Sequence, residues 1–217
     1  IQYYPELMDT YYSAHPENES VDQQIHKKPE LGEAGQAYHD ADTAPCFKAA
    51  FKHLKRSIPL SQGEPALEKI KVDPARFCKT ITQFAKFYGA CDVSFLSLLP
   101  HHFYSHKGRH GSTWGDKTDQ AYKTAITIVV PMRVGMIKNA PTSSVLQESA
   151  QKYVETAKIS NIVAEFIRGF GYKARAHNDG NYDLLCVPIA VESGLGELGR
   201  MGILMHEPMV PVSGLQR

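Results

Sequence analysis

The feature that most constrains the fold is a glycine-rich stretch near the end of the printed sequence. Gly194, Gly196 and Gly199 match the pattern GxGxxG, whose glycines let backbone amides approach a pyrophosphate in dinucleotide-binding folds. That interpretation requires the pattern in a first strand-to-helix turn, with an acidic residue about twenty positions further on, on a second strand. Here the sequence reaches Arg217 before such a strand could be completed. A dinucleotide site is therefore not expected.

The distribution of charge and of apolar residues excludes several classes of partner. The 217 residues include 24 Lys and Arg and 23 Asp and Glu, interspersed along the chain, so no basic block predicts nucleic-acid binding. No run of about 18 apolar residues predicts a membrane span, and IQYYPELMDTYYSAHPENES lacks the order of a signal peptide. The first residue is Ile, which suggests a processed chain, a trimmed chain or a fragment.

The cysteines do not form a recognisable cluster. Because no CxxC pair occurs, we expect free or buried thiols rather than an iron–sulfur cluster or a disulfide framework. The four cysteines are Cys46, Cys78, Cys91 and Cys186.

Local patterns predict several helices. Apolar residues recur at helical spacing in CFKAAFKHLKRSI, so a short helix is expected there. The clearest helix has Asp73 as its N-cap and Pro74 in its first turn, and it is expected to stop at Gly89. A longer helix is expected over residues 143–170, because its apolar residues share one face and a glycine follows it.

The remaining segments predict the strands and the overall fold class. VSFLSLL and AITIVV are apolar without helical period and are expected as buried strands. YKARAH and YDLLCVPIAV are expected as two more strands, joined by the turn HNDGN. Residues 1–45 show no sustained periodicity and are expected to form an extended arm before a domain over 46–217. The order predicts an α/β fold of the α+β type, without a regular βαβ repeat.

The glycine stretch resembles a known family when it is taken with its flanks. VPIAVESGLGELGRMGILM is similar to the reductive dehalogenase consensus, in which Val-Pro leads into AGLGE, GR and NGLLI. FAKFYGACDVSFLSL and SNIVAEFIRGFGYKA resemble segments of that family in the same order, so the similarity covers roughly residues 70 to 207. Met201 departs from the family, which usually has Asn there. Epoxyqueuosine reductases, the nearest corrinoid relatives, typically carry Trp-Ile-Gly-Lys where this chain has ELGR.

The resemblance implies a nitroreductase-like corrinoid-binding domain, with a mainly antiparallel central sheet flanked by long helices, and cobalamin as its cofactor. A flat macrocycle needs backbone close by without intervening Cβ atoms, which glycines allow. The alternative is a glycine-rich corner that is tightly packed for its own sake. The residues expected to contact the cofactor are Gly194, Leu195, Gly196, Glu197, Gly199, Arg200 and His106.

The resemblance also implies a reaction site. Tyr104 stands where the family has the tyrosine that delivers a proton, and a phenol with its usual pKa near 10 needs a neighbouring cation for that role. The position before Pro141 assigns that cation to Lys138, with Arg133 as its substitute. The alternatives are a tyrosine at the edge of the core and a solvated lysine. A metal site in the histidines of this loop is not expected, because their spacing is not that of HExxH and the loop carries no carboxylate until Asp116. These histidines are His101, His102, His106 and His110.

The expected function is cobalamin-dependent reductive dehalogenation of a small organohalide. The family continues into a part whose iron–sulfur clusters reduce the cobalt; no cluster ligands are recognised here, so an electron-donor protein or a separate iron–sulfur domain is expected as partner. The alternatives are a non-catalytic cobalamin-binding or trafficking module and a flavin-using relative. The sequence does not decide whether the chain forms a homodimer. It also does not decide between the cytoplasm and the outer face of the cytoplasmic membrane as the compartment.

Overall fold

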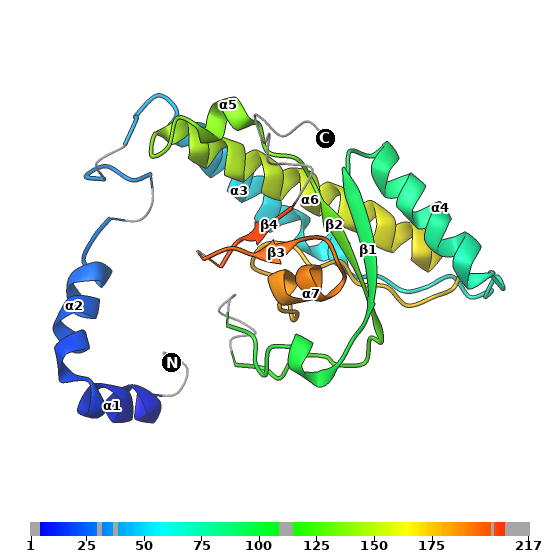
Figure 1. The fold of residues 1–217 in the computed structure, drawn as a ribbon, viewed down its shortest axis with the longest axis horizontal. Coiled ribbons are helices and arrows are strands. Elements are labelled where there is room, and N and C mark those ends of the chain that lie inside the picture. The colour runs from blue at the N-terminus through cyan, green and yellow to red at the C-terminus, as the bar shows by residue number, and fades with distance from the viewer. Residues whose placement is uncertain (1–4, 30–31, 37–38, 109–114, 201, 207–217) are drawn as a thin grey trace, which may run out of the picture.

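A computed structural model describes residues 5–29, 32–36, 39–108, 115–200 and 202–206. Helices and strands alternate irregularly along these segments (Figure 1). The elements in order are α1 (Pro5–Ala14), α2 (Pro16–His26), α3 (Ala44–Ser57), the 3-10 turn η1 (Ile58–Ser61), α4 (Pro74–Phe87), β1 (Asp92–Ser97), the 3-10 turn η2 (Pro100–His102), β2 (Thr124–Val129), α5 (Val134–Ile137), α6 (Ser143–Gly169), α7 (Cys186–Glu192), β3 (Glu197–Leu198) and β4 (Leu204–Met205).

The two strands predicted from apolar segments form the centre of the molecule. β1 and β2 pair antiparallel, with Val93 opposite Ile128 and Phe95 opposite Ile126. Because side chains alternate between the faces of a strand, these four lie on one face, where they pack against α4 and α6. The other face carries Ala125, which packs with α7. The sheet thus separates two apolar layers.

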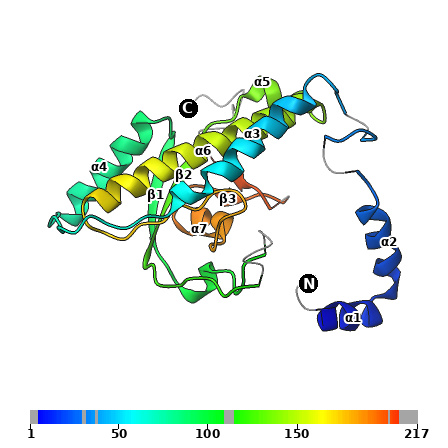
Figure 2. The same cartoon turned by 180° about the vertical axis from the view of Figure 1, so that it is seen from behind.

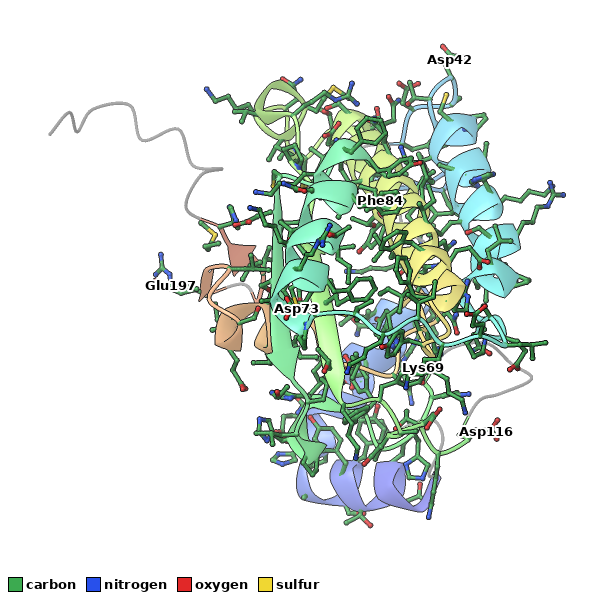
Figure 3. The ribbon with its side chains drawn as sticks, turned by 90° about the vertical axis from the view of Figure 1, so that its right-hand side faces the viewer. Asp42, Lys69, Asp73, Phe84, Asp116 and Glu197 are labelled. Atoms are coloured by element: carbon green, nitrogen blue, oxygen red, sulfur yellow. The ribbon has the colours of Figure 1, made fainter. Side chains whose placement is uncertain are left out.

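Helix α4 confirms the predicted start and stop. The Asp73 carboxylate accepts a hydrogen bond from the Arg76 N–H at 2.8 Å, and the helix ends just before Gly89, whose φ of 116° suits glycine. Its buried face holds Ile81 and Ala85. Figure 3 shows Phe84 directed into the layer between α4 and α6. The apolar stripe read from the sequence is therefore the core face.

Helix α6 joins both ends of the core. Its second half buries Ile159 and Val163 beneath β1 and β2, and its first half packs Ala150 against Phe47 of α3. At its end the buried Arg168 guanidinium donates to the carbonyls of η1 and of the segment that follows α6. The two predicted helices over 46–58 and 143–170 are both confirmed.

The sheet is smaller than predicted. The described residues form two antiparallel pairs, β1 with β2 and β3 with β4, and neither YKARAH nor YDLLCVPIAV forms a strand. Residues 186–192 form α7 instead, because Pro188 lacks the N–H that a ladder needs but suits the first turn of a helix. In YKARAH the Ala176 N–H donates to Ser61 at 2.9 Å, outside any ladder. The predicted turn between them is present, with Gly180 at φ 74°.

The first 45 residues are not the extended chain that was predicted, since they contain α1 and α2, and α3 already begins at Ala44. Both α1 and α2 begin with proline, and α2 has Glu17 and Glu19 in its first turn, where acidic side chains favour a helix. Figure 2 shows the two helices beside the body rather than over the sheet. None of the helices in the described segments has the length and apolar character needed to cross a membrane.

Candidate functional site

The glycine corner, defined as residues 193–199, connects α7 to the β3–β4 hairpin. A Cβ at Gly196 would lie 2.2 Å from the Met205 carbonyl oxygen, and one at Gly199 would lie 3.0 Å from that of Ile203. These two glycines are therefore required by the hairpin's own packing. A Cβ at Gly194 would meet nothing within 4 Å, and its φ is 80°. At Gly194 the corner presents bare backbone to open space.

The other residues predicted from the glycine stretch differ in exposure. Leu195 is buried, and its N–H donates to the Ala190 carbonyl at 3.0 Å, so it anchors the corner from inside. Glu197 and Arg200 are exposed at the hairpin. Figure 3 shows Glu197 pointing away from the sheet. The exposed side chains are thus available to a ligand on the outer side of the hairpin, and Leu195 is not.

A carboxylate at the end of α7 ties this corner to the Tyr104 loop, defined as residues 98–108. Glu192 Oε2 lies 2.9 Å from Nε2 of the fully buried His102, and Glu192 Oε1 lies 3.3 Å from Nε2 of the exposed His101. The hydrogen bond from His102, aided by that from His101, holds the pKa of Glu192 below its usual value. Ser94 of β1 ties the corner to the sheet as well, because its hydroxyl donates to that of Ser193 at 2.7 Å.

The proton positions show what this cluster can do. Nδ1 of His102 accepts the Leu99 N–H at 2.9 Å, so the proton of the neutral ring is on Nε2, from which it is donated to Glu192. The candidate ligand atoms of His101, His102 and Glu192 lie within 4.8 Å of one another, yet this tautomer leaves His102 no free lone pair for a metal ion. The cluster is a hydrogen-bonded clamp between the loop and the helix.

Tyr104 is held by its backbone and leaves its ring partly exposed. Its N–H donates to the Asp183 carbonyl at 2.8 Å, and its own carbonyl accepts the Thr118 hydroxyl. Tyr104 is 40% exposed, and the centroid of its ring lies 5.9 Å from that of Tyr182. His106, the other predicted residue of this loop, is half-buried and forms an isolated bridge with Lys117. His110 falls outside the described residues.

The structure does not bring Lys138 to Tyr104. Because β1 and β2 are antiparallel, the chain leaves β1 toward Tyr104 at one end of the sheet and leaves β2 toward Lys138 at the other, about 20 Å away for six-residue strands. Figure 1 shows α5 and the Tyr104 loop at these opposite ends. Arg133 lies at the α5 end as well, where its Nε donates to Glu148 at 2.7 Å. Neither Lys138 nor Arg133 therefore lies beside Tyr104 in this structure, and a cation that assists Tyr104 stays a prediction.

Arg175, which the sequence patterns did not predict as a site residue, is paired with the residue that holds the Tyr104 backbone. The Arg175 guanidinium donates to the Asp183 carboxylate, and both side chains are almost completely buried. Asp183 is also the residue whose carbonyl holds Tyr104, and its N–H donates to Nδ1 of His177 at 3.2 Å. Burial, followed by the charge of Arg175, lowers the pKa of His177 to about 4. Within the described residues, the buried Arg175 Nε has no hydrogen-bond partner.

Comparison of the sequence with known proteins identifies relatives of one kind. An 89-residue stretch, 41% of this chain, is 33% identical to a tetrachloroethene reductive dehalogenase of Dehalobacter restrictus and covers 16% of that protein. A tetrachloroethene reductive dehalogenase of Desulfitobacterium hafniense is 32% identical over the same length. Over this stretch the chain is similar to reductive dehalogenases. No family model matches it.

Solved reductive dehalogenase structures share the fold of this chain. The catabolic enzyme NpRdhA in complex with 3-bromo-4-hydroxybenzoic acid superposes with a TM-score of 0.65 and 20% identity over 78% of this chain. A reductive dehalogenase structure described as suggesting a mechanism for B12-dependent dehalogenation gives a TM-score of 0.65 over 75% of this chain. At this identity the likeness establishes the fold. The chain spans about a quarter of these solved chains, 24% in each case.

Proposed function

We propose that this chain forms the corrinoid-binding, tyrosine-bearing part of a cobalamin-dependent reductive dehalogenase that acts on small organohalides. The observation that carries the proposal is the Glu192 clamp, which joins the glycine corner to the loop that holds Tyr104. Through this clamp, a cofactor bound at Gly194 would lie on a segment that is tied to the loop of the proposed proton donor, Tyr104. The nitroreductase-like detail of the fold belongs to the same proposal.

The glycine corner fits one face of a corrinoid. Gly194 offers backbone without a side chain and has open space before it, which the close approach of a macrocycle requires. The exposed Glu197 and Arg200 supply hydrogen-bonding groups for the amide side chains at its rim. Two open hollows among the described residues, of 170 and 350 Å³, lie between α3 and α6, away from this corner. The proposed site is thus an open face rather than an enclosed cavity.

The reaction replaces a carbon–halogen bond with a carbon–hydrogen bond, consumes two electrons and one proton, and releases halide. When bound, the corrinoid supplies a cobalt centre that is reducible and has affinity for halide. Tyr104 supplies the proton from its hydroxyl, and His106 in the same loop offers a hydrogen bond to the substrate or to the corrinoid. Arg175 replaces Lys138 as the proposed nearby positive charge. The electrons come from a donor protein or an iron–sulfur domain.

Corrinoid binding tests the cofactor part of the proposal. The chain reconstituted with hydroxocobalamin is expected to retain a corrinoid absorbance band through gel filtration. Gly194→Ala is expected to weaken retention at least tenfold, because its methyl group enters the open face. Gly202→Ala is the matched control, since Gly202 has φ 73° and open space like Gly194 but lies at the other end of the hairpin. No retention at micromolar protein, or equal loss in both variants, contradicts the proposed site.

Turnover with a chemical reductant tests the role of Tyr104. Tyr104→Phe is expected to lower halide release at least a hundredfold over the free-corrinoid background while corrinoid retention stays unchanged. Tyr153→Phe, an exposed tyrosine on α6, serves as the control. If Tyr104→Phe releases halide as fast as the unchanged chain, Tyr104 is not the donor, and a corrinoid-binding module without chemistry becomes the better description.

A further inference from the structure

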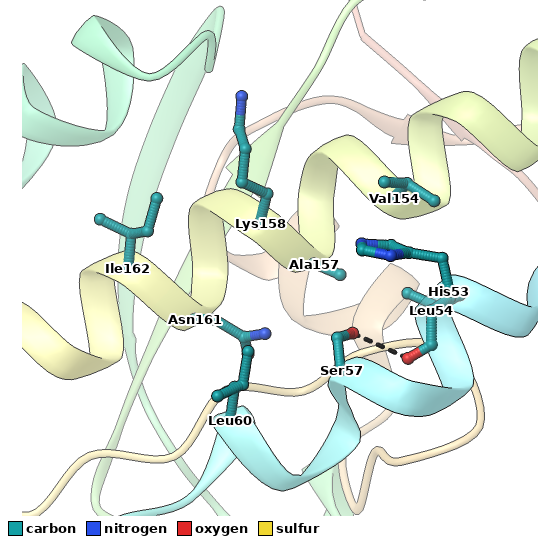
Figure 4. Close-up of a pocket in the computed structure, with 9 residues that line it drawn as sticks. All are labelled: His53, Leu54, Ser57, Leu60, Val154, Ala157, Lys158, Asn161 and Ile162. Atoms are coloured by element: carbon teal, nitrogen blue, oxygen red, sulfur yellow. Dashed lines mark hydrogen bonds between the residues drawn. The ribbon is translucent and has the colours of Figure 1, made fainter. Parts of the chain in front are cut away.

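A groove runs along one side of the contact between α3 and α6. It consists of two adjoining hollows, of 350 and 170 Å³, that share His53 and Val154 in their linings. Figure 4 shows the smaller one, with Leu54, Ser57 and Leu60 on one side and the side chains of α6 on the other. Leu60 is 63% exposed although it is a large apolar side chain. The groove therefore offers apolar surface that nothing in the described residues covers.

The ionisable side chains that line this groove are basic. Its lining residues, all within the described segments, include Lys158, His53 and Arg133 but no Asp or Glu. Arg133 is already paired with Glu148, so Lys158 is the lining cation left for a partner among these residues. Helix α3 itself carries Lys48, Lys52, Lys55 and Arg56 and no acidic residue. The groove therefore favours a partner that has an apolar face and acidic residues beside that face.

The chain carries a segment of that description in α2. Val21 and Ile25 are 51% and 55% exposed and lie four residues apart, so they share one helix face, with Glu17 one turn before them. From Pro5 to His26 the sequence contains acidic residues but no Lys or Arg. Helix α2 has no buried residue. Helix α2 is thus acidic, and the described residues of the same chain do not bury its apolar face.

We propose that helix α2 of one copy docks into the α3–α6 groove of a second copy, so that two chains exchange their amino-terminal helices. Each chain has one helix and one groove, so a two-fold arrangement forms two identical contacts at once. An eleven-residue helix is about 16 Å long, and the groove follows α6 from Gln147 to Ile162, about 23 Å, so the helix fits within it. Figures 1 and 2 show α2 lying away from α3 of its own chain, which favours exchange over folding back.

The oligomeric state is the first test. The 24.2 kDa chain is expected to sediment with about twice that mass at micromolar concentration. Val21→Ser combined with Ile25→Ser is expected to give the monomer mass and to raise the dissociation constant at least tenfold. Ser20→Ala combined with Gln23→Ser is the control, because both side chains are uncharged and point away from the Val21–Ile25 face of α2. A monomeric unchanged chain, or a dimer that survives the first pair, overturns the proposal.

Cross-linking distinguishes exchange from folding back within one chain. Two single variants, Ile25→Cys and Val154→Cys, are made in a background in which the exposed Cys46 and Cys186 are serine. Under mild oxidation the mixture of the two variants is expected to give a linked dimer that neither variant gives alone. A doubly substituted chain that links within itself, with no dimer band in the mixture, means that the helix covers its own groove and overturns the exchange.

Discussion

The side chain of His102 is fully buried, and its Nε2 lies 2.9 Å from Oε2 of Glu192, a residue ninety positions later in the sequence. The contact joins the turn after β1 to the end of α7, and with it the two segments on which the proposed site rests. Since Nδ1 of the same ring accepts the Leu99 N–H, both ring nitrogens are satisfied. Such a fully paired buried group fixes a local structure, because any other arrangement leaves a buried polar atom without a partner.

Replacing this histidine should therefore cost stability. His102→Ala removes both hydrogen bonds and leaves a cavity, so the free energy of unfolding should fall by about 2–4 kcal/mol in urea titrations. His101→Ala, at an exposed ring beside it, should change the free energy of unfolding by less than about 0.5 kcal/mol. Equal losses of stability in the two variants would contradict a special contribution of the buried His102.

The half-buried His177 predicts a dependence of stability on pH. Its pKa is lowered to about 4 in the folded chain, whereas the unfolded chain keeps the ordinary value near 6.5. Between these values the unfolded state binds a proton that the folded state does not, so stability should fall as the pH falls from 6.5 to 4, by about 3 kcal/mol. His177→Asn keeps an acceptor for the Asp183 N–H and should flatten this slope. Urea titrations of both proteins at several pH values measure it, and parallel slopes would contradict the assignment.

The glycines of the corner should differ in their tolerance of a side chain. Gly196→Ala places a Cβ against the Met205 carbonyl and keeps a φ of 154°, so it should destabilise the chain by about 3 kcal/mol or more. Gly194→Ala meets open space and carries the cost of positive φ alone, about 1 kcal/mol. Thermal unfolding of the two variants ranks them. An equal loss would mean that backbone strain, and not the contact with β4, explains both glycines.

Local chemistry in the sequence predicted the local structure. The Asp73 cap, the proline after it and the glycine that ends the helix act within a few residues, so α4 could be placed from the sequence. The segment over 182–191 misled because its apolar residues suit a strand as well as a helix face, and the buried Ile189 and Ala190 show that tertiary packing decided between them. Short patterns do not distinguish these cases.

The site depended on contacts that no local pattern contains. The predicted cation Lys138 followed the order of segments along the chain, whereas the antiparallel pairing of β1 and β2 sends Tyr104 and Lys138 to opposite ends of the sheet. The pairs that do meet, Asp183 with Tyr104 and Glu192 with His102, are separated by many residues. The sequence contains Arg175 as one of many charged residues, but no local pattern indicated that its side chain would be buried.

Arg168 provides the last prediction, because its guanidinium is 98% buried yet joins three segments. Its Nη1 donates to the Ala174 carbonyl at 3.0 Å, and its Nη2 donates to Glu165 at 2.6 Å, while the same group lies over the carbonyls of η1. Arg168→Met should leave four acceptors without this donor and lower the free energy of unfolding by about 3 kcal/mol or more, since the buried Ser61 carbonyl is among them.

The controls separate the loss of these donors from the loss of charge. Arg56→Met removes a charge from the exposed side of α3 and should change the free energy of unfolding by less than about 0.5 kcal/mol. Glu165→Gln should cost less than about 1 kcal/mol, because Glu165 is 75% exposed and its ion pair is screened by water. If Glu165→Gln costs as much as Arg168→Met, the ion pair rather than the bonds to the backbone holds the end of α6.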